Sequence, residues 1–184
     1  GTALAERIGA ETAAKVAAPV ERGLRPHLVA IQLGEQAASK IHGLLKSRHP
    51  GILTIVVPRH PERADELEAQ FIAAGHRVAR RSRREPVSGD TDILLGDTIG
   101  EMGLYLRLTE IAFVGRSLTG EGGQNPLEPA MLETAVLSGR NVQNFREAYE
   151  RLVKSGGARF VKDADMLAGA VNFLLTNPGK RHEM

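Results

Sequence analysis

The stretch ILTIVV at residues 52–57 decides the fold class of this chain. It is short, apolar nearly throughout and rich in β-branched residues, which is typical of a strand covered on both faces. The sequence PRHPER at residues 58–63 follows it and opens a helix-length segment that extends to residue 74. A buried strand followed by a helix indicates a βα unit of a parallel sheet.

The same alternation continues along most of the chain. Strands are predicted at residues 27–33, 52–57, 92–95, 110–114, 135–137 and 158–161. Helices are predicted at residues 36–47, 61–74, 100–106, 126–133, 144–154 and 164–175. Repeated βαβ units define the fold class as α/β, with a Rossmann-like, doubly wound parallel sheet.

The chain divides into three parts on this interpretation. Residues 1–24 are predicted to form an Ala-rich N-terminal helix followed by a linker. Pro19 and Gly23 end the helix and mark the linker. Residues 25–177 form the α/β domain, and residues 178–184 form a C-terminal tail.

Composition excludes several classes of protein. Among 184 residues, 42% are hydrophobic and 25% are charged, which excludes global disorder. A net charge of +2 is too small to predict nucleic-acid binding. The absence of cysteine excludes disulfides, thiolate metal sites and a cysteine nucleophile. No apolar run reaches the roughly 18 to 20 residues that span a bilayer, and the N-terminal segment is too charged for a signal peptide, so we expect a soluble chain.

Five arginines fall within eight positions at residues 77–84. A charge-dense run of this kind is typical of a solvated loop or a sheet edge, and attraction of an anion is the alternative.

Parallel sheets of this kind bind ligands beyond the carboxyl ends of their strands, so the loops there carry the candidate site. Arg59 and His60 follow the strand at residues 52–57 and precede Pro61, which suits the first turn of a helix. A position beside a helix N-terminus suits an anion. The alternative is that Arg59 pairs with a nearby carboxylate.

The sequence GDTIGEM at residues 96–102 follows the next predicted strand. Asp97 or Thr98 can cap the helix after it, and Glu101 completes a capping box three residues after Thr98. Gly100 allows a ligand to approach the free backbone N–H groups, so a phosphate or a base edge could share this site.

A glycine-rich loop at residues 115–124 leads into NPLEPA at residues 125–130. Asn125 is the natural N-cap of the helix, and Glu128 stands at the capping-box position. Such a turn is a common cradle for a phosphate or a sugar, but it lacks the P-loop spacing. A flexible loop without a ligand is the alternative.

The other polar residues that could form a site are expected to have structural roles. Surface or core roles are predicted for the histidines that show no metal-like spacing: His27, His42, His49, His76 and His182. Ser117 has no evident base nearby, so nucleophilic catalysis is not expected. Asp163 and Asp165 start the last helix and complement its dipole.

Taken together, PRHPER, GDTIGEM and NPLEPA follow successive predicted strands in this order. In this combination the chain resembles the C-terminal half of 3-deoxy-D-manno-octulosonic acid (Kdo) transferase, a glycosyltransferase with the two-domain GT-B fold. The similarity covers about residues 25–177 and includes FVG at residues 113–115 and NF at residues 144–145.

The resemblance implies the donor domain of an inverting enzyme that transfers Kdo from CMP-Kdo to a lipid A precursor in lipopolysaccharide biosynthesis. It implies that the nucleotide lies against Pro58, Arg59 and His60. It implies that the phosphate and cytosine lie near Ile99, Gly100 and Glu101. It implies that the ribose and phosphate lie near Asn125, Pro126, Leu127 and Glu128. Glu128 then accepts a hydrogen bond from a hydroxyl group.

The resemblance also implies what this chain does not carry. In the family, the acceptor-binding half, the membrane-anchoring segment and the catalytic base belong to the N-terminal half, so no catalytic residue is expected here. The expected partners are CMP-Kdo and, through that half, the lipid A precursor and the membrane; nucleic acid is not expected. No cofactor and no metal are expected. The full-length protein is expected at the cytoplasmic face of the bacterial inner membrane, and the fragment alone is expected to be inactive.

The loop after the first strand departs from the family pattern. Residues 30–36 read AIQLGEQ, where only Gly34 and Glu35 of the usual pattern remain. This change affects recognition of the Kdo sugar more than that of CMP. Two alternatives therefore stay open: a related GT-B transferase that uses another nucleotide sugar, and a non-catalytic nucleotide-binding or interaction domain.

Overall fold

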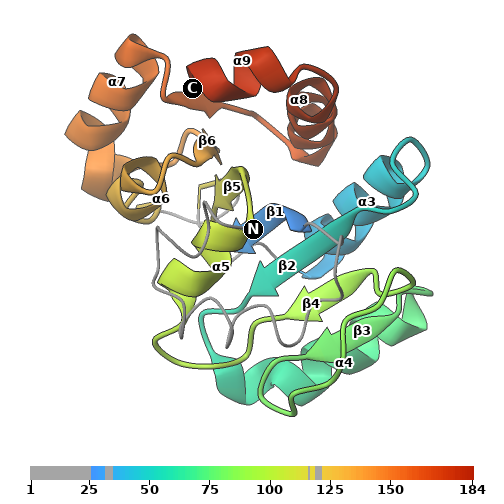
Figure 1. Ribbon diagram of the computed structural model, residues 1–184. Coiled ribbons are helices and arrows are strands. Elements are labelled where there is room, and N and C mark those ends of the chain that lie inside the picture. Colours follow the sequence, from blue (N-terminus) through green and yellow to red (C-terminus); the bar gives the residue numbers. More distant parts are fainter. Residues whose placement is uncertain (1–25, 32–34, 116, 119–121) are drawn as a thin grey trace.

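The structure, a computed structural model, describes residues 26–31, 35–115, 117–118 and 122–184 (Figure 1). The predicted N-terminal helix and linker at residues 1–24 lie outside the described residues. The same holds for residues 32–34 of the loop after the first strand.

Within the described residues, seven parallel strands form one sheet in the order β3-β4-β2-β1-β5-β6-β7. The strands are β1 (Pro26–Ile31), β2 (Leu53–Val57), β3 (Val78–Arg80), β4 (Ile93–Leu95), β5 (Ile111–Val114), β6 (Ala135–Ser138) and β7 (Ala158–Phe160). The first strand lies in the middle, and later strands are added on both sides of it. This confirms the predicted doubly wound parallel sheet.

The connections between strands are mostly helical. The helices are α3 (Glu35–Lys46), η1 (Pro61–Arg63), α4 (Ala64–Ala73), α5 (Met102–Leu108), α6 (Leu127–Met131), η2 (Gln143–Phe145), α7 (Arg146–Ser155), α8 (Ala164–Thr176) and α9 (Pro178–Glu183). Helices α3, α4 and α8 cover one face of the sheet, and α5, α6 and α7 cover the other (Figure 1).

Strand β2 shows why the sequence selects this architecture. All five of its residues are buried. Leu53 and Ile55 pack with Tyr105 of α5, whereas Val56 points to the other face and packs with Phe71 of α4. Apolar side chains on both faces require a helix layer on each side, which explains the nearly continuous apolar run.

Two elements differ from the expected pattern. Strand β3 was not predicted, because its three residues lie within the arginine run. It is one of the two edge strands of the described sheet, which agrees with the edge interpretation of that run. Arg80 is nevertheless only 8% exposed. Helix α9 lies in the segment expected as a tail and packs against α8.

Among the described residues, no helix combines the length and the apolar character needed to cross a bilayer.

Candidate functional site

The three candidate segments lie at the carboxyl edge of the sheet. They follow β2, β4 and β5, respectively. Figure 1 shows the arrowheads of β2 and β4 pointing to the same side of the molecule, where α5 begins. The sheet changes direction at β1, which has β2 on one side and β5 on the other. In open α/β sheets this switch point is where ligands bind.

The segment after β2 leaves a cation exposed. Arg59 is exposed and has no ion-pair partner among the residues that the structure describes. This contradicts the alternative in which a described carboxylate neutralises it. His60 is also exposed, and its Nδ1 lies 3.3 Å from Glu62 Oε1. Pro61 is the first residue of η1, as predicted, and Pro58 is partly buried at the end of the strand.

The segment after β4 is anchored to the edge strand through Asp97. This carboxylate is 7% exposed and accepts hydrogen bonds from Ser82 N at 2.8 Å, Ser82 Oγ at 2.5 Å and Arg80 Nε at 2.9 Å. Burial opposes ionisation, but these bonds and the guanidinium charge outweigh it and lower the pKa of Asp97. Arg80 also pairs with Asp65 and Glu68 of α4.

The capping box predicted for this segment is wrong. Helix α5 begins at Met102, and its N-cap residue, Glu101, makes no side-chain capping bond. Asp97 is held by Ser82 and Arg80, while Thr98 Oγ1 is hydrogen-bonded to Tyr105 Oη at 2.7 Å. The side chains that local spacing assigns to the helix cap are therefore hydrogen-bonded to residues further away in the chain.

The three predicted contact residues of this segment differ in exposure and in bonding. Ile99 is 89% exposed, and Gly100 is exposed with a φ of +79°, a conformation that favours glycine. Glu101 pairs with Arg81 Nη2 at 3.1 Å. Partial burial opposes ionisation of Glu101, yet hydrogen bonds from Thr98 and Arg81 lower its pKa.

The segment after β5 presents a carboxylate close to α5. Helix α6 begins at Leu127, and its N-cap residue, Pro126, makes no side-chain capping bond, so the predicted N-cap at Asn125 is wrong. Asn125 Oδ1 instead accepts a hydrogen bond from Leu127 N at 3.0 Å in the turn that leads into the helix. Pro126 is buried, while Leu127 and Glu128 are exposed. Glu128 Oε1 lies 3.5 Å from the point where a Cβ on Gly103 would stand. The structure thus brings the segments after β4 and β5 together.

Arg107 is a residue of this site that the sequence analysis missed. Its Nη1 donates to Gly103 O at 3.0 Å, so the side chain folds back over the preceding turn of α5. A Cβ on Gly103 would lie 2.8 Å from the same Nη1. Gly103 therefore leaves room for a guanidinium beside the exposed carboxylate. The sequence did hold one signal: Gly103 lies four positions before Arg107, and residues four apart share one face of a helix.

Ser117 has a structural role. Its Oγ donates to Val114 O and accepts from Gly139 N, both at 2.8 Å. Asn141 N donates to Ser117 O at 3.0 Å. These bonds tie the chain after β5 to the chain after β6, which agrees with the expectation that Ser117 is no nucleophile. Asp163 is also structural, since it caps α8 by accepting from Met166 N at 2.8 Å.

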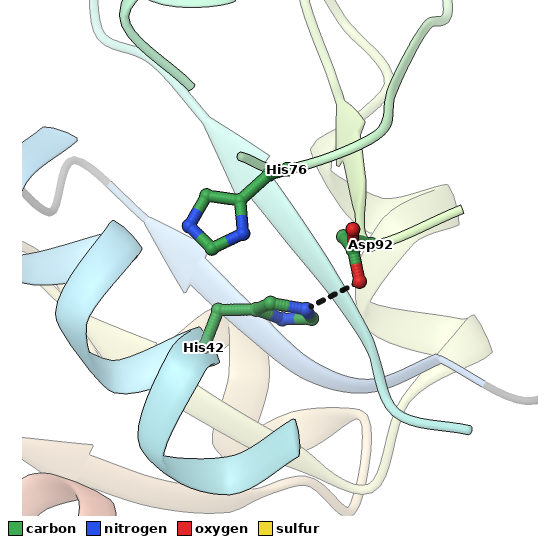
Figure 2. Close-up of side chains that lie close together, drawn as sticks. All are labelled: His42, His76 and Asp92. Carbon is green, nitrogen blue, oxygen red and sulfur yellow. Dashed lines mark hydrogen bonds and ion pairs between the residues drawn. The ribbon is translucent and has the colours of Figure 1, made fainter. Parts of the chain in front are cut away.

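A separate polar cluster lies at the opposite, amino edge of the sheet. It contains His42 of α3, His76 after α4 and Asp92 before β4 (Figure 2). His42 is fully buried, and His42 Nε2 lies 3.1 Å from Asp92 Oδ1. Sequence spacing did not reveal this cluster, because the fold brings together residues that lie far apart in the chain.

Fold and site together define a class of protein: Rossmann-like domains, whose ligands bind beyond the carboxyl ends of the strands. The sequence matches no family model. It is 37% identical over 146 residues to 3-deoxy-D-manno-octulosonic acid transferase of Haemophilus influenzae, covering 79% of this chain and 34% of that protein. It is 39% identical over 136 residues to the transferase of Bordetella pertussis, covering 73% and 32%, respectively.

The chain is thus a relative of the Kdo transferases, as the three motifs predicted, and spans about a third of their length. Its fold is similar to the C-terminal CMP-Kdo binding domain of WaaA from Acinetobacter baumannii, with a TM-score of 0.80. That likeness covers 100% of this chain and 98% of the other at 24% identity. The UDP-GlcNAc 2-epimerase of Neisseria meningitidis shares the fold more distantly, with a TM-score of 0.58 and 12% identity over 45% of that chain.

Proposed function

We propose that this chain is the donor-binding domain of a Kdo transferase and that it binds CMP-Kdo. The observation that carries the proposal is the position of the three family motifs. The chain is 37–39% identical to Kdo transferases over 136–146 residues, and the three motifs all lie at the carboxyl edge of the sheet. The full-length protein would transfer Kdo to a lipid A precursor at the cytoplasmic face of the inner membrane.

The chemistry of the edge suits a nucleotide. Arg59 is exposed and without an ion-pair partner among the described residues, and guanidinium groups bind phosphate in two-point geometry. Backbone N–H groups at residues 99–101, after β4 at the same edge of the sheet, are available for the phosphate or the base. Glu128 would accept a hydrogen bond from a ribose hydroxyl, and the Arg107 guanidinium, like Glu128, lies close to Gly103.

In the transfer reaction, a base on the N-terminal half takes the proton from the acceptor hydroxyl. The oxygen then attacks the anomeric carbon, the bond to the phosphate breaks, and CMP leaves with the electron pair. The role of this domain is to hold the donor and to stabilise the negative charge on the leaving phosphate, chiefly through Arg59. We expect this to require no metal.

Replacing Arg59 with Ala is expected to weaken CMP binding about 10- to 150-fold, the equivalent of about 1.5–3 kcal/mol for a charged hydrogen bond. The measurement is a two-dimensional NMR titration of the chain with CMP, which detects millimolar affinities. Arg48→Ala is the control, because Arg48 is exposed but precedes β2 at the amino edge. Equal affinities of wild type and Arg59→Ala would remove Arg59 from the site.

The same titration with UMP and AMP tests the nucleotide itself. Localised shifts at Arg59, Gly100 and Glu128 with CMP alone support the proposal. A preference for another nucleotide indicates a transferase with a different donor. Equal shifts with every nucleotide, or none, contradict donor binding by this domain.

Glu128→Gln is expected to weaken binding of CMP by about tenfold or more, because the neutral amide replaces a charged acceptor for the ribose hydroxyls. The variant should bind 2′,3′-dideoxy-CMP as the wild type does, since that ligand has no hydroxyl to lose. A loss that is equal for both ligands would place Glu128 outside the ribose contact.

A further inference from the structure

The cluster of His42, His76 and Asp92 has the composition of a metal site. One ligand atom from each residue lies within 4.8 Å of those of the other two. The three residues come from α3, the turn after α4 and the residue before β4, so the cluster joins three elements at the amino edge (Figure 2). This edge is opposite to the proposed donor site.

Two hydroxyl groups fix the orientation of the imidazole rings. His42 Nδ1 is hydrogen-bonded to Thr54 Oγ1 at 2.8 Å, and His76 Nε2 to Ser39 Oγ at 2.7 Å. Each ring therefore has one nitrogen held from behind and one left for the cluster. Metal-ligating histidines are oriented by such outer partners.

Asp92 already attracts a cation to this place. Its Oδ2 accepts from Arg77 N at 2.9 Å, while Oδ1 faces both His42 Nε2 at 3.1 Å and Lys46 Nζ at 2.8 Å. The Lys46 side chain is 48% exposed, so its ammonium can turn outward into water. The separation of 3.1 Å is close to the roughly 3.4 Å between neighbouring ligands of a tetrahedral zinc ion with bonds of about 2.1 Å.

We propose that His42, His76 and Asp92 form a binding site for a divalent transition cation, with zinc as the best match, and that Lys46 occupies the site as a competing internal cation. Two imidazoles and one carboxylate are a common ligand set for zinc, and water completes a tetrahedron. Binding moves the ammonium into solvent and joins α3 to the turn after α4 and to the start of β4. The site is independent of the proposed donor function.

The test is calorimetric titration of the tag-free, chelator-treated chain with zinc chloride, together with the visible spectrum of bound Co²⁺. We expect one ion per chain, a tetrahedral cobalt spectrum and a higher melting temperature with zinc. His76→Phe, which keeps an aromatic ring beside Phe71, should lower zinc affinity by more than about tenfold, since even an outer-shell partner contributes about 10–100-fold.

Lys46→Met distinguishes the proposed competition from chance binding. Removing the ammonium should raise zinc affinity severalfold, because the ion no longer has to displace it. His49→Gln is the matched control: His49 is bonded to Asn172 Oδ1 at 2.9 Å, outside the cluster, and its replacement should leave the affinity unchanged. Failure of both the wild type and Lys46→Met to bind zinc would overturn the proposal. Undiminished binding by His76→Phe would do the same.

Discussion

Replacing Arg80 with Met is expected to lower the free energy of unfolding by about 3–5 kcal/mol. The Arg80 side chain is 10% exposed and that of Asp97 is 1% exposed, and they form a hydrogen-bonded ion pair at 2.9 Å. The variant keeps the apolar stem but leaves the Asp97 carboxylate buried without its guanidinium. Removing one partner of a buried pair costs far more than the pair contributes on balance, because the remaining charge is not compensated.

Denaturant unfolding monitored by circular dichroism measures this loss. Arg83→Met is the matched control, because Arg83 contacts the same two acidic residues of α4, Asp65 and Glu68, at 3.3 and 3.4 Å, but its side chain is 52% exposed. Exposed ion pairs contribute about 0–1 kcal/mol, so the control should change stability little. A loss below 1 kcal/mol for Arg80→Met would show that the pair does not stabilise the fold.

The second large effect is expected for Gly139→Ala, at the end of β6. A Cβ on Gly139 would lie 2.1 Å from the carbonyl oxygen of Ser117, which itself accepts a hydrogen bond from Asn141 N. Backbone atoms cannot yield as a flexible side chain can, so the two loops must separate. We expect a loss of about 3 kcal/mol, the upper part of the usual range for overpacking.

Gly43→Ala serves as the comparison for this substitution. Gly43 lies inside α3, and its added Cβ would meet nothing within 4 Å. Alanine in a helix interior is favoured over glycine by about 0.5–1 kcal/mol, so this variant should be more stable than the wild type. If the two variants change stability in the same direction and to the same extent, the close approach at Ser117 is not what constrains Gly139.

The parts of the fold that depend on local pattern were predictable from the sequence. The run at residues 52–57 contains β2, and the helix expected at residues 36–47 corresponds to α3. A strand buried on both faces has a continuous apolar sequence, and a helix buried along one stripe has apolar residues every three to four positions, so both patterns can be recognised in the sequence. Strand β3 left no such trace. Its arginines look solvated in the sequence, and only the carboxylates of α4 and Asp97 explain why Arg80 is buried.

The candidate site was predictable to a similar degree. The motifs located its edge, because the carboxyl ends of parallel strands meet there. The capping box at Thr98 was wrong, since Ser82 and Tyr105 supply partners that are distant or out of register. Arg107 and the cluster of His42, His76 and Asp92 depend on packing between elements, which spacing along the chain does not encode.

The attachment of the loop after β4 bears on how a ligand would bind. Gly96 N is bonded to Val56 O at 2.8 Å, and Asp97 is fixed by Ser82 and Arg80, so the loop is held on both sides without a ligand. A preorganised loop loses little conformational entropy on binding. The interaction energy gained there would therefore appear almost entirely as affinity. Ordering of the loop would not limit the association rate.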